Sequence, residues 1–220
     1  MNPQLLPAIQ TVLILDDDLM ITEGLSAGLE GPGRNIIVCN DLESAELAIE
    51  WLAPTHIVSD IHITGRFGFE GLDLVRYAKR HLPGCRTILM TGDAPEALQT
   101  EAAERGAVAF LKKPFEVAEL EALINVMSNA PASDDQEGTM IRLPLLDEIL
   151  SGGGLYPVFM PIVKLGETWT PFGYEALARL RTDSPLANPE RLFQYAARKS
   201  RIADLEKTCI QNALAAAGKP

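Results

Sequence analysis

The sequence predicts an α/β protein whose first part folds as a five-stranded, doubly wound parallel sheet. Short apolar runs of strand length alternate with segments of helical periodicity five times between residues 11 and 127. The runs lack the polar alternation of a half-exposed strand, which is typical of strands buried on both faces. A strand–helix order repeated in this way predicts parallel strands joined by right-handed crossovers, with helices on both faces of the sheet.

The individual elements follow from these runs and from the turn formers between them. The predicted strands cover residues 11–15, 36–39, 55–59, 87–90 and 107–111. Apolar residues at helical spacing predict helices at about 19–29, 42–52, 71–81, 95–105 and 115–127. Glycine and proline stop the first four helices, at Gly31-Pro32-Gly33, Pro54, Pro83-Gly84 and Gly106.

A second domain is predicted after a linker. Residues 128–139 are polar and rich in turn formers, so residues 1–127 form the predicted first domain and residues 140–220 the second. The second domain is predicted to contain a short helix, a strand pair and two further helices. These elements cover about 143–150, 158–163, 172–180, 189–199 and 201–217.

The charge distribution differs between the two parts and excludes some functions. Residues 1–139 hold 9 Lys and Arg against 22 Asp and Glu, a net charge of −13, whereas residues 140–220 hold 10 against 8, a net charge of +2. No nucleic-acid partner is therefore expected. Three widely spaced cysteines, no signal-peptide pattern and no apolar run of membrane length predict a cytoplasmic protein without a membrane partner.

Five polar residues stand directly after predicted strands. Asp16 and Asp17 follow the first strand, Asp60 the third, Thr91 the fourth and Lys113 the fifth. Open α/β sheets bind their ligands at the carboxyl ends of the strands, so these side chains are expected to share one crevice. Taken singly, a carboxylate after a strand is more often a helix cap, but the joint placement favours a site.

This set of residues suits phosphoryl transfer. Asp16 and Asp17 repel each other, and Mg²⁺ relieves such repulsion through hard oxygen ligands. Asp60 is placed to attack phosphorus and form an acyl phosphate. Lys113 and the Thr91 hydroxyl are placed to meet phosphoryl oxygens. Asp18, in contrast, is interpreted as the N-cap of the next helix.

Residues 11–127 resemble the receiver domain of two-component response regulators, which has a flavodoxin-like fold. The matching motifs are Leu15-Asp16-Asp17, Asp60, Thr91-Gly92 and Phe110-Leu111-Lys112-Lys113-Pro114-Phe115. The resemblance implies that Asp60 is the phosphoacceptor and that Asp16 and Asp17, with Asp60, hold Mg²⁺. It also implies that Thr91 is the switch hydroxyl, Phe110 the switch aromatic, and Lys113, not Lys112, the family's lysine. The implied partner is a sensor histidine kinase or a phosphotransfer protein of a phosphorelay.

The chain departs from the receiver pattern after Asp60. Thr64 stands where the family usually has proline, and Gly65-Arg66-Phe67-Gly68-Phe69 lengthens the loop before Gly71. His62 stands where the family's metal receives a backbone carbonyl. The rim of the site is therefore expected to differ in shape, while the site itself is retained.

The second domain resembles the start of an EAL domain, the cyclic di-GMP phosphodiesterase family. The motif is Glu175-Ala176-Leu177 followed by Arg179, with Pro161-Ile162-Val163 before it. By resemblance, Glu175 would bind catalytic Mg²⁺ or Mn²⁺ and Arg179 a nucleotide phosphate, while Met160 replaces a frequent glutamine. The family's (β/α) barrel needs roughly 200 residues, so an incomplete barrel fragment without phosphodiesterase activity is expected, either a piece of a longer protein or a naturally short regulator.

The sequence thus predicts a phosphorelay response regulator in which phosphorylation of Asp60 switches an attached EAL module. One alternative is a non-enzymatic adaptor whose C-terminal segment mediates dimerisation. Another is a DNA-binding regulator that uses the last two helices, with basic residues Arg191, Arg198, Lys199 and Arg201. Because two strands cannot close a barrel, self-association through the C-terminal segment is also expected.

Overall fold

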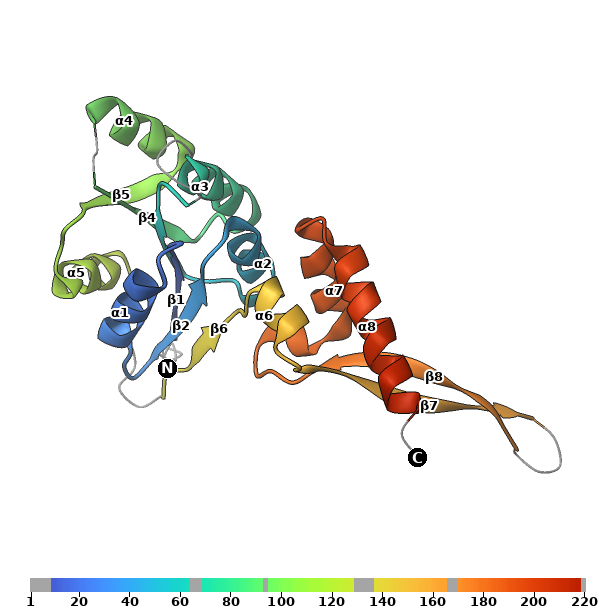
Figure 1. The fold of residues 1–220 in the computed structure, drawn as a ribbon. Helices are drawn as coiled ribbons and strands as arrows, with labels where there is room; N and C mark the ends of the chain where they lie inside the picture. Colours follow the sequence, from blue (N-terminus) through green and yellow to red (C-terminus); the bar gives the residue numbers. More distant parts are fainter. Residues whose placement is uncertain (1–8, 64–68, 93–94, 129–136, 166–169, 219–220) are drawn as a thin grey trace. The chain divides into compact units, whose positions relative to one another are not determined.

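The computed structural model describes residues 9–63, 69–92, 95–128, 137–165 and 170–218 (Figure 1). The chain forms two compact units, Met1–Leu143 and Pro144–Pro220. Most of the predicted linker (residues 129–136) and the loop positions 64–68, including Thr64, lie outside the described residues.

The first unit is built on a parallel sheet. Its first five strands are β1 (Gln10–Leu15), β2 (Arg34–Cys39), β3 (His56–Asp60), β4 (Arg86–Thr91) and β5 (Ala107–Lys112). The strand order is β5-β4-β3-β1-β2-β6, and every neighbouring pair is parallel. The order changes direction at β1, between β2 and β3, where doubly wound sheets place their ligand crevice.

The sheet has six strands, so the prediction of five was wrong. The sixth, β6 (Met140–Arg142), pairs with the outer edge of β2. Its backbone contacts include the Ile36 amide, which donates to Thr139 O at 2.9 Å, and the Leu143 amide, which donates to Val38 O at 3.3 Å. Residues 140–142, predicted to open the second domain, therefore belong to the first sheet. A segment of three residues is too short to show a hydrophobic periodicity, so the sequence did not predict this strand. The strand is defined by its backbone pairing with β2.

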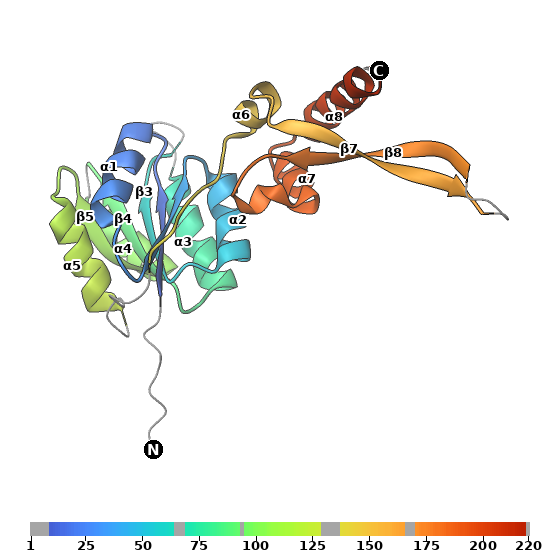
Figure 2. The same ribbon diagram turned by 90° about the horizontal axis from the view of Figure 1, so that it is seen from below.

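Five helices cover the two faces of this sheet (Figure 2). Helices α1 (Leu19–Leu29) and α5 (Val117–Met127) lie on one face, and α2 (Leu42–Leu52), α3 (Glu70–His81) and α4 (Glu96–Arg105) on the other. Each face has its own apolar core, centred on Val12, Ile14, Leu25 and Leu120 on the first and on Ile61, Leu72 and Leu89 on the second. The predicted doubly wound arrangement is confirmed.

Local capping explains where several helices begin and end. Asp18 caps α1, as predicted, because its Oδ1 accepts a hydrogen bond from the Met20 amide at 2.8 Å. Asp41 caps α2 in the same way through the Ser44 amide. Gly106 ends α4 with φ at 115°, a conformation that only glycine adopts readily.

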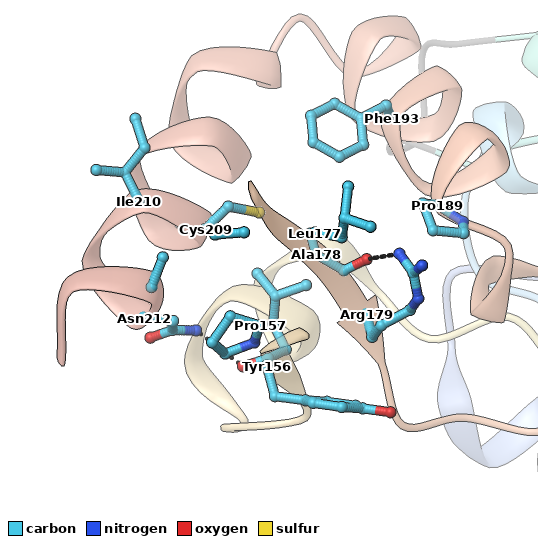
Figure 3. Close-up of a pocket in the computed structure, with 13 residues that line it drawn as sticks. Tyr156, Pro157, Leu177, Ala178, Arg179, Pro189, Phe193, Cys209, Ile210 and Asn212 are labelled. Atoms are coloured by element: carbon cyan, nitrogen blue, oxygen red, sulfur yellow. Dashed lines mark hydrogen bonds between the residues drawn. The ribbon is translucent and has the colours of Figure 1, made fainter. Parts of the chain in front are cut away.

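The second unit consists of α6 (Leu146–Ser151), β7 (Leu155–Lys164), β8 (Thr170–Leu180), a short 3₁₀ turn (Pro185–Ala187), α7 (Pro189–Arg198) and α8 (Ile202–Ala217). This order matches the prediction, and β7 and β8 form an antiparallel hairpin. Residues of the hairpin, α7 and α8 line a cavity of about 340 Å³ (Figure 3). Among the described helices, none is long and apolar enough to cross a membrane.

Candidate functional site

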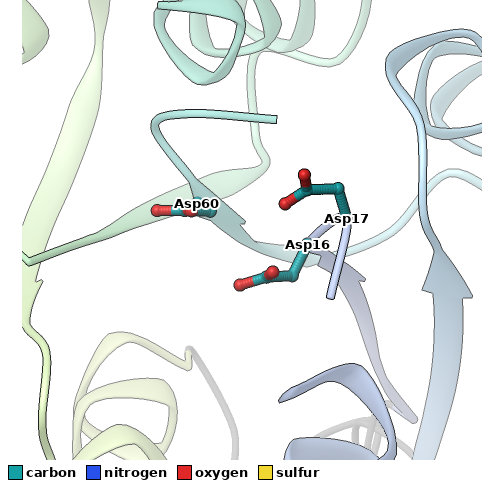
Figure 4. A group of neighbouring side chains, drawn as sticks. All are labelled: Asp16, Asp17 and Asp60. Atoms are coloured by element: carbon teal, nitrogen blue, oxygen red, sulfur yellow. The ribbon is translucent and has the colours of Figure 1, made fainter. Parts of the chain in front are cut away.

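Three carboxylates meet at the carboxyl ends of β1 and β3 (Figure 4). Asp16 and Asp17 follow β1, and Asp60 is the last residue of the neighbouring β3. One oxygen of each carboxylate lies within 4.8 Å of the others. Asp16 is buried, Asp60 is partly buried and Asp17 is exposed, so the cluster opens to solvent on one side.

The backbone around Asp16 is held by several hydrogen bonds. Its Oδ1 accepts from the Asp18 amide at 3.0 Å, and its amide donates to Cys39 O at 3.4 Å. The side-chain amide of Asn40 donates to Asp16 O at 2.9 Å. The sequence analysis did not single out Asn40, although it stands directly after β2, in the same position that identified the other residues.

Lys113 brings a cation to the cluster from the end of β5. Its Nζ lies 2.8 Å from Asp16 Oδ2 and 3.4 Å from Asp60 Oδ2. Its backbone amide donates to Thr91 O at 2.8 Å, which fixes the loop after β5 against β4. Lys112 is exposed and makes no ion pair among the described residues, so Lys113 is the lysine that the structure places beside the carboxylates.

Thr91 and Phe110 flank the cluster on β4 and β5. Thr91 is buried at the end of β4, one residue beyond the partner of Asp60 in the β3–β4 register. Phe110 is partly buried and packs against the apolar cluster beneath α3 and α4. Thr91 therefore lies on the strand next to β3, whereas Phe110 lies on β5, one strand farther from Asp60.

Gly71 is a second residue that the sequence analysis did not assign to the site. It lies in the first turn of α3, and its amide donates to Ile61 O at 3.0 Å. A Cβ atom at this position would lie 2.2 Å from Asp60 O and 2.7 Å from Ile61 Cα. Only glycine allows α3 to begin this close to the backbone of Asp60.

The electrostatics of the cluster favour a bound cation. Burial raises the pKa of Asp60, the Lys113 ammonium opposes this shift, and the Asp16 carboxylate adds to it. Partial desolvation and the Asp16 carboxylate raise the pKa of Asp17. Three converging carboxylates with one lysine keep an excess of negative charge, and their oxygens are the donors that Mg²⁺ prefers. The residues present therefore fit a magnesium site.

We expect Asp17→Asn to raise the unfolding temperature slightly at pH 7 without divalent cations, because Asp17 is exposed and solvent screens its charge. Because the folded-state pKa of Asp17 is raised, its ionised form is less favourable in the folded chain than in the unfolded chain. This penalty is present above the folded pKa and disappears as the pH falls below the ordinary value of 3.8. Thermal unfolding in a chelator at pH 7 and near pH 3 should show the gain at the higher pH only. Equal stability at pH 7 would contradict the repulsion argument.

Comparison with known proteins is consistent with this site. Residues 12–125 match the family model of the response regulator receiver domain. Transcriptional regulatory protein FixJ of Bradyrhizobium diazoefficiens is 30% identical over 113 residues, covering 51% of this chain and 54% of FixJ. DNA-binding transcriptional regulator NtrC of Escherichia coli strain K12 is 28% identical over 161 residues, covering 71% of this chain and 33% of NtrC. The chain therefore spans about half the length of FixJ and a third of NtrC.

A solved structure supports the fold. Chemotaxis protein CheY4 of Vibrio cholerae matches with a TM-score of 0.50 at 20% identity, and the match covers 55% of this chain and 100% of CheY4. At that identity the likeness concerns the fold alone.

The residues predicted to act in the second unit are not gathered into a comparable cluster. Glu175 is exposed on β8, opposite Met160 of β7. Arg179 lines the cavity of the second unit, and its guanidinium donates to Ala178 O at 2.7 Å (Figure 3). Among the described residues, the only group of three or more potential metal ligands is that of Asp16, Asp17 and Asp60.

Proposed function

The chain belongs to the response regulator receiver family, and from that premise we propose that Asp60 accepts a phosphoryl group with the help of Mg²⁺ held by Asp16, Asp17 and Asp60. The observation that carries this proposal is the convergence of three carboxylates and Lys113 at one edge of the sheet. The donor we propose is a phosphohistidine on a sensor kinase or a phosphotransfer protein. Small phosphodonors such as acetyl phosphate carry an equivalent group.

The proposed step is an in-line displacement at phosphorus. A carboxylate oxygen of Asp60 forms a bond to phosphorus, and the bond from phosphorus to the donor nitrogen or oxygen breaks with its electron pair leaving on the donor. Lys113, already 3.4 Å from Asp60 Oδ2, pairs with the phosphoryl oxygens of the product. When bound, Mg²⁺ neutralises charge on the phosphoryl group and helps to orient it.

We further propose that Thr91 and Phe110 respond to phosphorylation. The Thr91 hydroxyl would donate to a phosphoryl oxygen from the strand next to the acceptor. Phe110 would change its packing beneath α3 and α4. A new anion that biases a packed element is the general basis of such switches.

Labelling of the whole chain tests the proposed function. Incubation with acetyl phosphate and Mg²⁺ should give an acyl-phosphate adduct that hydroxylamine releases and that maps to the peptide containing Asp60. An excess of chelator should prevent the adduct from forming. An adduct on another residue, or labelling unaffected by the chelator, would contradict the proposal.

We also propose that the second unit is the beginning of an EAL domain whose complete form, in a longer protein, would act on cyclic di-GMP. The proposal is supported by the antiparallel β7–β8 hairpin, which carries Glu175 and Arg179 on β8 and is followed by two helices. The residues matched by the receiver model end at 125 and do not include this unit. The alternative remains a non-enzymatic adaptor that signals through its C-terminal segment.

We expect no hydrolysis of cyclic di-GMP by the 220-residue chain. Glu175 joins no group of metal ligands among the described residues, and a single carboxylate does not assemble a two-metal hydrolytic site. Chromatographic assay with Mg²⁺ and with Mn²⁺ should show unchanged substrate. Hydrolysis that is lost in Glu175→Ala would overturn this expectation.

We expect the chain to self-associate through the β7–β8 hairpin. Large apolar side chains are exposed along it, among them Phe172 at 70% and Tyr174 at 63%. A two-stranded sheet also leaves both strand edges unpaired, and a second copy could cover them. Sedimentation velocity at rising concentration should show a dimer that Phe172→Ser weakens. A monomer at every concentration would contradict this.

The basic residues of the DNA-binding alternative are partly neutralised. Arg201 forms ion pairs with Asp147 and, at 2.8 Å, with Asp204. FixJ and NtrC are named as transcriptional regulators, but the chain covers only part of each. A lack of nucleic-acid binding therefore stays a prediction, which generic DNA at low salt would test.

A further inference from the structure

The segment Gly138–Leu143, which contains β6, docks on the edge of β2 through a short set of contacts. The ladder is three residues long, with Ile141 opposite Ile37. Leu143 is 2% exposed, whereas Met140 is 51% exposed. The docked segment thus depends on a few backbone bonds, on a hydrogen bond that the Thr139 amide donates to Asn35 Oδ1 at 3.0 Å, and on one buried side chain. A contact of this size can open locally.

Gly138 fits where no larger residue would. A Cβ atom there would lie 2.1 Å from Arg34 O and 2.6 Å from Gly31 O. These oxygens belong to the backbone and cannot rotate away. Any side chain at position 138 must therefore displace the start of the segment.

A chain of hydrogen bonds along β2 connects the segment to the acid cluster, which is the group of Asp16, Asp17 and Asp60. The Leu143 amide donates to Val38 O, and the next residue of β2, Cys39, accepts from the Asp16 amide. Asn40 follows, and its amide donates to Asp16 O at 2.9 Å and to Thr22 Oγ1 at 3.2 Å. Among the described residues no donor reaches the buried Asn40 Oδ1. The two bonds that the Asn40 amide donates therefore hold this side chain in place. They do so although leaving a buried oxygen unpaired is unfavourable.

We propose that docking of the Gly138–Leu143 segment and Mg²⁺ binding at Asp16, Asp17 and Asp60 are thermodynamically coupled, with Asn40 as the positioning residue that links them. This inference rests on the proposed magnesium site. A docked segment pairs the outer edge of β2 and so fixes its end, which holds the Asn40 amide against Asp16 O. Release of the segment frees the carboxyl end of β2 and leaves Asp16 and Asp17 less well positioned.

The coupling has a defined sign and acts in both directions. Mg²⁺ binds the docked state more tightly, so Mg²⁺ in turn favours docking by the same factor. The segment ends at Leu143, and Pro144 begins the second unit. The occupancy of the acid cluster would thereby change the freedom of the connection between the units. An edge strand that only covers β2 would have no such effect.

The experiment compares two glycines in the full chain. Gly138→Ala should release the segment, whereas Gly84→Ala is the matched control, because a Cβ at Gly84 meets no described atom within 4 Å. Leu143→Ser is a second releasing variant that removes the buried anchor. Hydrogen exchange over residues 34–39 and 138–143 reports release, and calorimetric titration with Mg²⁺ reports affinity.

We expect Gly138→Ala to weaken Mg²⁺ binding about fivefold, within the usual range of such couplings, and Gly84→Ala to leave it unchanged. Asn40→Ala should weaken binding too, and Asn40→Ala with Gly138→Ala should bind no more weakly than Asn40→Ala alone. Mg²⁺ should slow exchange over 138–143 in the wild type and not in Asn40→Ala.

Three results would overturn the inference. The first is that the losses of Mg²⁺ affinity caused by Asn40→Ala and Gly138→Ala add up in the double variant. The second is that the segment is released while Mg²⁺ affinity stays equal to that of Gly84→Ala, and the third is that neither Gly138→Ala nor Leu143→Ser releases the segment. A wild-type chain that does not bind Mg²⁺ would instead refute the proposed function.

Discussion

Asp60→Asn is expected to reduce acyl-phosphate labelling to the background of an untreated chain. The amide cannot replace the carboxylate as a nucleophile toward phosphorus, and Asp60 is the acceptor in the proposed function. Labelling with acetyl phosphate and Mg²⁺, followed by intact-mass measurement, would show the loss. Equal labelling of the variant and the wild type would refute the assignment of Asp60.

Loss of folding would not account for that result. Asparagine has the shape of aspartate and keeps an oxygen that can accept from the Ile61 amide, as Asp60 Oδ1 does at 2.9 Å. Burial raises the pKa of Asp60, so removing its charge should not lower stability at neutral pH. Asp73→Asn is a suitable control, because Asp73 is an exposed carboxylate of α3 that pairs with Arg76 and Arg105. It should label like the wild type.

The sequence predicted the first five strands because each contains a short apolar run, and it predicted the site residues because they obey one positional rule. Asp16, Asp60, Thr91 and Lys113 each stand at the end of a strand, and parallel strands bring those ends to one edge. Asn40 follows the same rule after β2 and could have been found by it. A side-chain amide that holds a backbone carbonyl has no acid, base or metal-binding chemistry that would single it out in a sequence.

Two features could not be predicted because they depend on close approach of backbone atoms. The need for glycine at position 71 arises from Asp60 O, which is distant along the chain but would lie 2.2 Å from a Cβ. The docking of β6 likewise depends on the free edge of β2 and on Gly138. In the second unit, the segments 158–163 and 172–180 predicted a strand pair, but a pattern within two strands does not identify what covers their exposed sides.

Gly71→Ala is expected to destabilise the chain by about 2 kcal/mol, as overpacking of a closely packed site does, although alanine is the better helix former. The added Cβ would meet Asp60 O and Ile61 Cα, so either α3 or the end of β3 must move. Because such a shift misplaces the acceptor carboxylate, labelling by acetyl phosphate should slow by roughly 10- to 100-fold. Chemical denaturation and labelling rates measure the two effects.

Gly24→Ala provides the matched control with the opposite sign. Gly24 lies in α1, where a Cβ meets no described atom within 4 Å, so the substitution adds helix propensity without a clash. It should stabilise the chain by about 0.5–1 kcal/mol and leave labelling unchanged. If Gly71→Ala were as stable and as readily labelled as Gly24→Ala, the close approach of α3 to Asp60 would not be what positions the acceptor.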